Sequence, residues 1–301
     1  MSGVQRWFEL IRKVAYREGV LGDALADDLM RAVEKFDAPE IAREAAHFQE
    51  PMWGYNDHRT GRALESQPSP IWVFNMLHWV TDTRDPMTYT HMSSFAHYWM
   101  PPHWLAGTEK TSQEKLKKTY RDFFGVDGVL DAGFEPLDAK VKAAKWFSDR
   151  AFLKESLITC DWIFPRLLRG FNSWEELEAA PDYYGDVEAE AKMLAPLTGM
   201  DITNAQLEQA GERIRNLDRA LQVRNYDRSR AIDETGEWYF ELPEKSDGTK
   251  LDKPTFDRIL EAYYQVRGWD EASGRPTRAK LEELGLCDVA DELEAAGQLP
   301  K

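Results

Sequence analysis

One residue whose side chain could take part in chemistry is a cysteine, Cys160. Cys160 lies in the stretch ESLITCDWIF, with Glu155 before it and Asp161 directly after it. A thiolate can bind iron, and a nearby carboxylate can orient a polar group. The chain has only one other cysteine, Cys287, and no C-x-x-C pair. From spacing alone, a buried structural thiol is the simpler interpretation of Cys160.

Histidine and aromatic residues are concentrated in residues 71–104. An imidazole titrates in the range needed for general acid–base work. His91 and His97 are six residues apart, which does not place both on one helix face, so a local metal pair is disfavoured. Arg84 and Asp85 either hold a cofactor phosphate or pair with each other, and the pair is the simpler reading. Singly, each histidine is better explained as a hydrogen-bonded core residue or a surface residue, and the tryptophans as core.

The composition excludes several classes of protein. The chain has 301 residues, 43% of them hydrophobic, with 11 tryptophans and a formal net charge of −15. This negative charge disfavours nucleic-acid and anionic-membrane binding, which need a clustered positive surface. No signal pattern is present, and no apolar run reaches the ~20 residues that span a bilayer. With two distant cysteines, a reducing cytoplasm is expected.

The elements that must position these residues are helical. Leu21, Leu25, Leu29 and Val33 are four apart and predict a buried helix stripe after a break at Gly19 and Gly22. Residues 111–124 predict an amphipathic helix, and another is expected from about Leu137 to Phe164, ending at Pro165. Residues 37–70 read as irregular. We therefore predict an all-α, multihelical fold.

Helix signals become cleaner toward the C-terminus. Ser173 with Glu176 and Thr203 with Gln206 match the capping box. Pro254 and Gly268 predict the two ends of one helix, and Thr277 and Gly285 those of the last strong helix. EWYFEL is the best of few strand signals, and the arginines of DRSRAID (227–233) read as a solvated face rather than a phosphate site. An apolar stripe is predicted after Thr203, comprising Leu207, Ala210, Ile214, Leu217 and Leu221.

Three stretches together resemble one family, the aldehyde ferredoxin oxidoreductases, which are tungsten- or molybdenum-pterin enzymes. KVAYREGVLGDALADDLMRA resembles a helix of that family, and ESLITCDWIF resembles its second pterin and cluster segment. GMDITNAQLEQAGERIRNLDRALQVRN followed by ILEAYYQVRGWDEASGRPTRAKLEELGL is similar to its C-terminal region and is the most specific match. The resemblance covers about Ile11 to Leu286.

The resemblance implies a fold and a set of cofactors. Family members enclose a metal held by two pterin dithiolenes, beside one [4Fe–4S] cluster on four cysteines. This chain looks like the C-terminal helical half, with residues 1–58 forming part of the second domain and residues 59–301 the third. The fourth cluster cysteine aligns with Cys160. The C-x-x-C-x-x-x-C run that supplies the other three is absent, so they would come from a missing N-terminal half or a partner chain.

The same resemblance assigns expected roles to individual residues. Glu155, Ser156 and Leu157 correspond to the pterin segment, with Glu155 in place of aspartate and Ile158 and Thr159 in place of glycine and leucine. A loose alignment places His91 nearest the acid–base histidine. Asp161 and Arg84 complete the candidate cofactor-binding set.

The resemblance also implies an activity. The expected reaction is oxidation of an aldehyde to an acid, with electrons passed to ferredoxin. Reduction of a carbonyl or of an aromatic thioester is a neighbouring possibility. The alternative is a non-catalytic helical interaction protein that has lost its cofactor half. A homodimer is one candidate assembly. If a missing half covers the helices, residues 71–104 and Cys160 should expose apolar surface.

Overall fold

The computed structural model describes residues 3–26, 35–36, 72–82, 112–131, 133–160, 164–234, 240 and 251–300. This part of the chain is helical, as predicted, and contains two isolated β-bridges but no strand. No helix within these ranges has the length and apolarity needed to cross a membrane. The chain forms two compact units, Met1–Gly54 and Tyr55–Lys301. The predicted irregular segment 37–70 and all of EWYFEL except Phe240 lie outside the described residues.

The first unit contains helices α1 (Gly3–Ala15) and α2 (Gly19–Leu25). They are separated by a turn in which Arg17 has a φ of 53°. The break thus falls before Gly19, and Gly22 lies inside α2. A Cβ at Gly22 would come within 2.5 Å of the Lys13 carbonyl oxygen, so glycine permits the close approach of the two helices.

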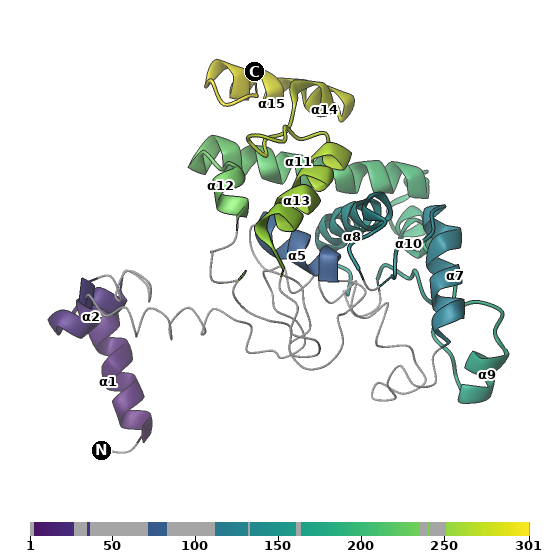
Figure 1. Ribbon diagram of the computed structural model, residues 1–301, viewed down its shortest axis with the longest axis horizontal. Coiled ribbons are helices and arrows are strands. Elements are labelled where there is room, and N and C mark those ends of the chain that lie inside the picture. The colour runs from purple at the N-terminus through teal and green to yellow at the C-terminus, as the bar shows by residue number, and fades with distance from the viewer. Residues whose placement is uncertain are drawn as a thin grey trace. The chain divides into compact units, whose positions relative to one another are not determined.

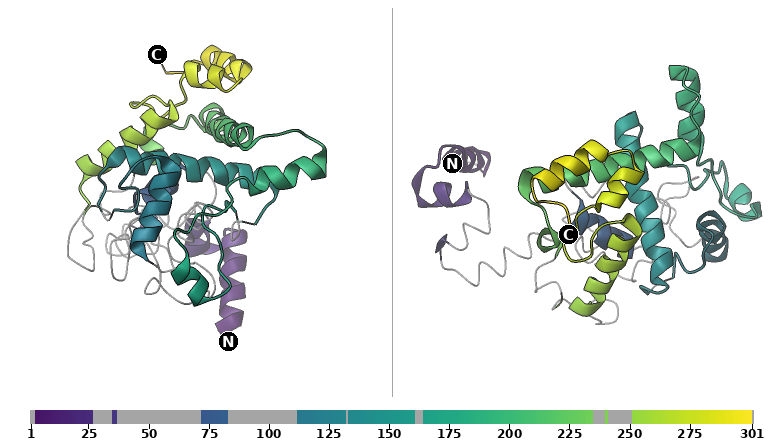
Figure 2. Two further views of the ribbon diagram at one scale, coloured as in Figure 1. Left: turned by 90° about the vertical axis from the view of Figure 1, so that its right-hand side faces the viewer. Right: turned by 90° about the horizontal axis from the view of Figure 1, so that it is seen from above.

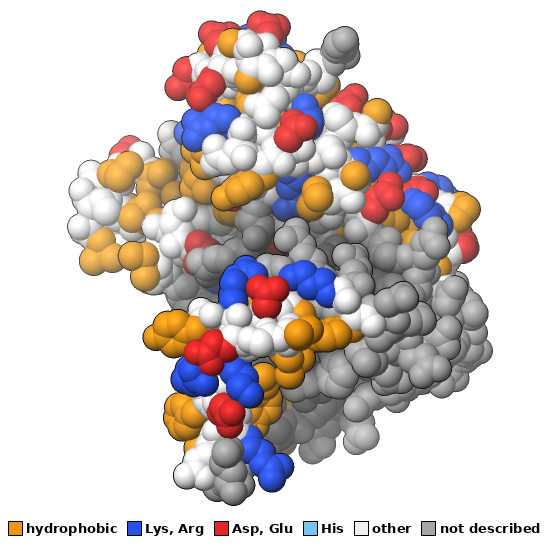
Figure 3. All heavy atoms as spheres, turned by 90° about the vertical axis from the view of Figure 1, so that its left-hand side faces the viewer, with side chains coloured by type: hydrophobic (Ala, Val, Ile, Leu, Met, Phe, Trp, Pro, Cys, Tyr) orange, Lys and Arg blue, Asp and Glu red, His pale blue; other side chains and the backbone are white. Residues whose placement is uncertain are grey.

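The predicted buried stripe is not found at its first position. Leu21 is 50% exposed, and the buried residues of α2 are Gly22 and Ala24 instead. Leu29 and Val33 lie outside the described residues. On α1 the exposed apolar side chains alternate with charged ones in Figure 3; those that are large and hydrophobic are Val4, Trp7, Phe8 and Ile11.

The second unit is built around α8 (Leu137–Leu157), which packs against α5 (Trp72–Thr81), α7 (Gln113–Phe124) and two long helices, α11 (Asn204–Tyr226) and α13 (Lys253–Arg267). Figure 1 shows α14 and α15 stacked on the side of α11 away from α5. The other helices in the described residues of this unit are α9 (Trp174–Ala179), α10 (Ala189–Thr198), α12 (Arg230–Asp233), α14 (Arg278–Glu283) and α15 (Cys287–Ala295).

Helix α5 lies inside the core rather than on a docking face. Val73, Phe74, Met76 and Leu77 are fully buried, and Phe74 packs against Phe147 of α8. The expectation that residues 71–104 expose an apolar patch is therefore wrong for the described part of that stretch. An apolar helix in the middle of a sequence is covered here by the protein's own helices.

Most predicted helix ends are confirmed by their caps. The Thr203 hydroxyl accepts a hydrogen bond from the Gln206 amide, and the Gln206 side chain accepts one from the Thr203 amide, which completes the capping box. At α9 the Ser173 hydroxyl accepts from the Glu176 amide, whereas the Glu176 carboxylate binds Asn172. Helices α13 and α14 begin and end close to the predicted positions, but α15 follows as a further helix.

Helix α11 has a polar buried face that the sequence did not predict, while Leu217 of the predicted stripe packs against an apolar cluster that includes Ala220 and Val223. Leu207 is buried, but Leu221 is 39% exposed. The face toward α8, α5 and the loop after α13 instead carries Arg215 and Arg219 as buried residues. Gly211 allows this face to approach α8, because a Cβ there would lie 2.5 Å from the Asp149 carbonyl oxygen. Guanidinium groups can occupy such an interior only where acceptors surround them.

Candidate functional site

The segment around Cys160, which we call the Cys160 turn (residues 155–160), begins in the last turn of α8. The helix ends at Leu157, and Ile158 adopts the left-handed conformation with a φ of 54°. The Ile158 amide donates to the Glu155 carbonyl and the Thr159 amide to the Lys154 carbonyl, a Schellman pattern. Helix α8 therefore stops well before Pro165, and Cys160 lies outside the helix in which the sequence placed it.

The Cys160 turn is exposed. Cys160 is exposed, and the side chain of Ile158 is 93% exposed. Beneath it, Leu157 packs on a small apolar cluster that α8 shares with α10 and α11. Helix α10, which projects from the second unit in both views of Figure 2, is also apolar on its outside, where Leu197 is 79% exposed. Exposed apolar side chains are thus present on the Cys160 turn and on α10, in the direction of the prediction.

The side chains expected to face a pterin have local partners. The Glu155 carboxylate is 3.1 Å from the buried Lys154 ammonium, and the Ser156 hydroxyl donates to the Phe152 carbonyl. Leu157 is half-buried in the cluster beneath the turn. Glu155 and Ser156 are both exposed, and the Glu155 carboxylate is a charged acceptor for the N–H groups of a ring.

Among the described residues, Cys160 could serve as one ligand of an iron–sulfur cluster. Cys160 is an exposed free cysteine, so its sulfur could bind one iron of a cluster whose other irons are bound by cysteines from elsewhere. Across the described ranges, no three His, Cys, Asp or Glu side chains gather in an arrangement that could hold a metal ion. The Cys160 turn therefore suits a contributed ligand, and this part of the chain does not hold a cluster by itself.

Three of the predicted site residues, Arg84, His91 and Asp161, lie outside the described residues. His78 of the same stretch is described, and it is a core residue as the simpler interpretation held. Its Nε2 atom lies 3.0 Å from the Ala144 carbonyl oxygen of α8. Burial lowers the pKa of His78 to about 4, against a weaker opposing effect of this hydrogen bond, so the ring is neutral at pH 7.

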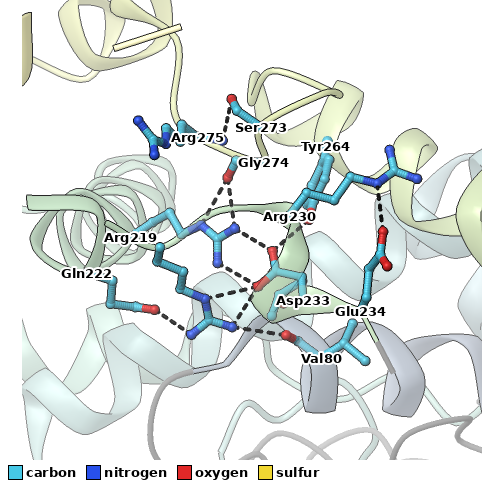
Figure 4. Close-up of polar contacts among 12 residues, drawn as sticks. Val80, Arg219, Gln222, Arg230, Asp233, Glu234, Tyr264, Ser273, Gly274 and Arg275 are labelled. Atoms are coloured by element: carbon cyan, nitrogen blue, oxygen red, sulfur yellow. Dashed lines mark hydrogen bonds and ion pairs between the residues drawn. The ribbon is translucent and has the colours of Figure 1, made fainter. Parts of the chain in front are cut away.

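A second polar arrangement, the Asp233 cluster (Arg219, Arg228, Asp233 and Tyr264), lies buried in the second unit (Figure 4). The Asp233 carboxylate, 0% exposed, accepts hydrogen bonds from both guanidinium groups and from the Tyr264 hydroxyl at 2.6 Å. Burial acts to raise the pKa of Asp233, but the charges and hydrogen bonds of Arg219 and Arg228 outweigh it and hold the pKa below its ordinary value.

Arg228 of this cluster has an acceptor for every donor. Nε and Nη2 bind Asp233, Nη2 also binds the Val80 carbonyl, and Nη1 binds the Asp82 carbonyl and the Gln222 side chain. A guanidinium has five N–H donors, all of which are used here. The reading of 227–233 as a solvated face is therefore wrong, and Arg228 has no donor left for a cofactor phosphate.

Gly274 and Trp269, both in the segment after α13, also contact the buried arginines. Gly274, at a φ of +66°, accepts from Arg219 through its carbonyl, and a Cβ there would lie 2.8 Å from the Tyr264 hydroxyl oxygen. Arg215, Arg219 and Arg267 lie with their guanidinium carbons 4.7–5.7 Å from the ring centroid of Trp269. The tryptophan of the RGWD motif thus makes cation–π contacts with three buried arginines.

Sequence reasoning missed this arrangement, although a signal was present. Arg215 and Arg219 are four apart on a helix, and Asn216 between them binds the Trp269 indole N–H at 2.8 Å. Arginines at helical spacing on a face that also carries apolar residues are a reason to look for acidic partners inside the fold. Asp233 is that partner for Arg219, and Asp218 is that partner for Arg215.

The comparisons with known proteins agree with this architecture. A solved structure described as "Active site complex BamBC of Benzoyl Coenzyme A reductase in complex with 1,5 Dienoyl-CoA" is similar in fold, with a TM-score of 0.57 and 19% identity. The match covers 100% of this chain and 42% of that one, so the chain spans under half of its length. The family description "Aldehyde ferredoxin oxidoreductase, domains 2 & 3" matches residues 3–286, and the chain therefore belongs to the aldehyde ferredoxin oxidoreductase family.

Proposed function

We propose that this chain is the helical C-terminal part of a tungsten- or molybdenum-pterin, iron–sulfur oxidoreductase that oxidises aldehydes to carboxylic acids and passes electrons to ferredoxin. The observation that carries the proposal is the exposed thiol of Cys160 at the end of α8, in a chain whose residues 3–286 match the family. The remaining cluster ligands come from a companion polypeptide or an N-terminal half.

In this proposal the chain provides one ligand and the surroundings of the cofactor. The metal–pterin group and the cluster supply the redox chemistry when they are bound. Cys160 would bind one iron through its sulfur, and Glu155 would accept a hydrogen bond from a pterin ring N–H. Ser156, Leu157, Asp161 and Arg84 would complete the residues that hold the cofactor. His91 accepts the proton that is released as an aldehyde hydrate is oxidised.

A second candidate reaction within the same class is reduction of an aromatic thioester. It is favoured by the likeness in fold to a structure whose description names benzoyl coenzyme A reductase and a dienoyl-CoA. The two reactions run in opposite redox directions. An assay of the complete assembly with a reduced electron donor and an aromatic thioester, beside one with an aldehyde and an oxidised acceptor, separates them.

A third candidate is a non-catalytic helical scaffold. It is favoured by the scarcity of metal ligands, because the described residues bring no three candidate ligands together. This candidate predicts that the chain binds neither metal nor cluster under any condition of expression.

The deciding experiment is metal analysis with a matched pair of cysteine variants. The chain is expressed alone and together with a companion that carries the C-x-x-C-x-x-x-C run, and tungsten, molybdenum and iron are measured. Because Cys160 and Cys287 are both exposed, Cys287→Ser is the control for Cys160→Ser. We expect the cluster absorbance to be lost in Cys160→Ser alone. Absence of metal from both preparations of the wild type would defeat the enzymatic proposal.

A further inference from the structure

Helix α5 ends at a set of buried arginine donors. The last carbonyl groups of a helix have no partner within it and carry partial negative charge. Here the Thr81 carbonyl accepts from Arg215 at 2.8 Å, and the Val80 and Asp82 carbonyls accept from Arg228 at 3.0 and 2.9 Å. Three consecutive carbonyls are thus held by two cations from residues more than a hundred positions later in the chain.

These two arginines are themselves fixed. Arg215 is 1% exposed, lies between the rings of Phe152 and Trp269, and pairs with Asp218 at 3.2 Å. Arg228 is held by Asp233, to which Arg219 also binds (Figure 4). The end of α5 is therefore tied to α11 and α12, and through Tyr264 to α13.

We propose that Arg215 and Arg228 are positioning residues, which fix the end of α5 and thereby the point from which the chain leaves this helix toward Arg84 and His91. The anchoring of α5 is independent of the proposed function, whereas the effect on catalysis rests on it. Neither arginine touches substrate or cofactor in this role. Each acts through the backbone of residues 80–82.

Lysine variants test the anchoring, because lysine keeps the charge but has three donors and no planar fork. Arg230→Lys is the matched control: Arg230 lies two residues from Arg228, and its ion pairs go to Glu234 at 3.7 Å and, on α13, to Asp257 at 3.3 Å and Glu261 at 2.9 Å. Amide hydrogen exchange is measured on the purified chain.

In Arg228→Lys we expect exchange of the 80–82 amides to accelerate at least about tenfold, while α8 and α13 change by less than about twofold. Arg230→Lys should leave α5 unchanged. Unaltered exchange at residues 80–82, or an equal increase in every helix, overturns the proposal. If Arg228→Lys does not fold, Arg215→Lys is judged by the same criterion, because of the three carbonyl contacts at the end of α5 it alters only the one to Thr81.

The catalytic consequence is measured in the complete, metal-loaded assembly. Arg228→Lys should lower kcat per bound metal by about tenfold with KM unchanged, and Arg230→Lys should change neither. A purely structural role lowers the yield of loaded enzyme but not kcat per metal. An unchanged kcat per metal overturns the positioning role. Absence of metal from the wild-type assembly defeats the proposed function instead and leaves the exchange result standing.

Discussion

The Cys160 turn and the Asp233 cluster both involve the C-terminal part of a long helix, and they differ in almost every physical respect. The Cys160 turn spans the end of α8 and exposes a thiol and an isoleucine. The Asp233 cluster joins α11 to the segment that follows it, and it buries two cations and a carboxylate whose hydrogen bonds are made within the chain. The Cys160 turn exposes side chains that another molecule could contact, whereas the polar groups of the Asp233 cluster are hydrogen-bonded to one another.

This difference teaches where a polar residue acts for the fold and where it is available for chemistry. A buried charge whose donors are all used cannot bind a ligand without losing a contact that the fold needs. An exposed thiol beside an uncovered apolar side chain makes no such contribution to stability. Substitutions should therefore affect the two regions in opposite ways.

The largest effect is expected at the carboxylate of the cluster. Asp233→Ala leaves Arg219 and Arg228 buried without their anion, and we expect it to lower the unfolding free energy by about 3–5 kcal/mol. Asp291→Ala, which removes an exposed partner of Arg278 on α15, should cost less than about 1 kcal/mol. Denaturant unfolding of both variants measures this contrast, and equal losses would contradict a complete cluster.

Acid should weaken the core through His78, which lies in the last turn of α5. The folded-state pKa of about 4 lies below the ordinary 6.5, so the unfolded chain takes up the proton first. The stability that neutral His78 contributes is present above pH 6.5 and is lost as pH falls toward 4, by up to about 3 kcal/mol.

The control for this pH dependence is His78→Gln, which has no titrating ring and keeps an N–H for the Ala144 carbonyl. Denaturant unfolding at pH 7 and at pH 4.5 gives the change for each protein. The variant should lose less stability than the wild type over this interval, and parallel losses would show that His78 does not respond as its burial requires.

The Cys160 turn should respond to substitution by gaining stability. Ile158 is 93% exposed and has a φ of 54°, a conformation that a β-branched side chain disfavours. Ile158→Gly should therefore raise the unfolding free energy by about 1 kcal/mol. Thermal unfolding checks this, and a loss of stability would mean that the isoleucine side chain packs within the chain itself.

The smallest effect on the isolated chain is expected at the thiol. Cys160→Ser changes an exposed side chain and should alter the unfolding free energy by less than about 0.5 kcal/mol. Denaturant unfolding of the chain alone provides the value. A loss of 2 kcal/mol or more would indicate a structural thiol and remove the reason for treating it as a contributed ligand.

Local chemistry made much of the fold predictable. The hydroxyl of Thr203 with Gln206, and Pro254 with Gly268, determine helix ends through contacts within one turn, and the structure has them where the sequence placed them. The end of α8 was missed because Pro165 was the visible stop signal. Ile158, a residue that rarely takes a left-handed conformation, ends the helix seven residues earlier.

By itself, the sequence determined the helical class, the family and the segment in which Cys160 lies, because periodicity, caps and motif order are local properties of the chain. Only the tertiary structure decided that α5 is core, that Arg228 is committed to Asp233 and to the end of α5, and that Cys160 is exposed. The physical reason is that burial and the saturation of hydrogen bonds depend on which distant segments meet. Val80 and Arg228 become neighbours only when α5 and α12 are packed together.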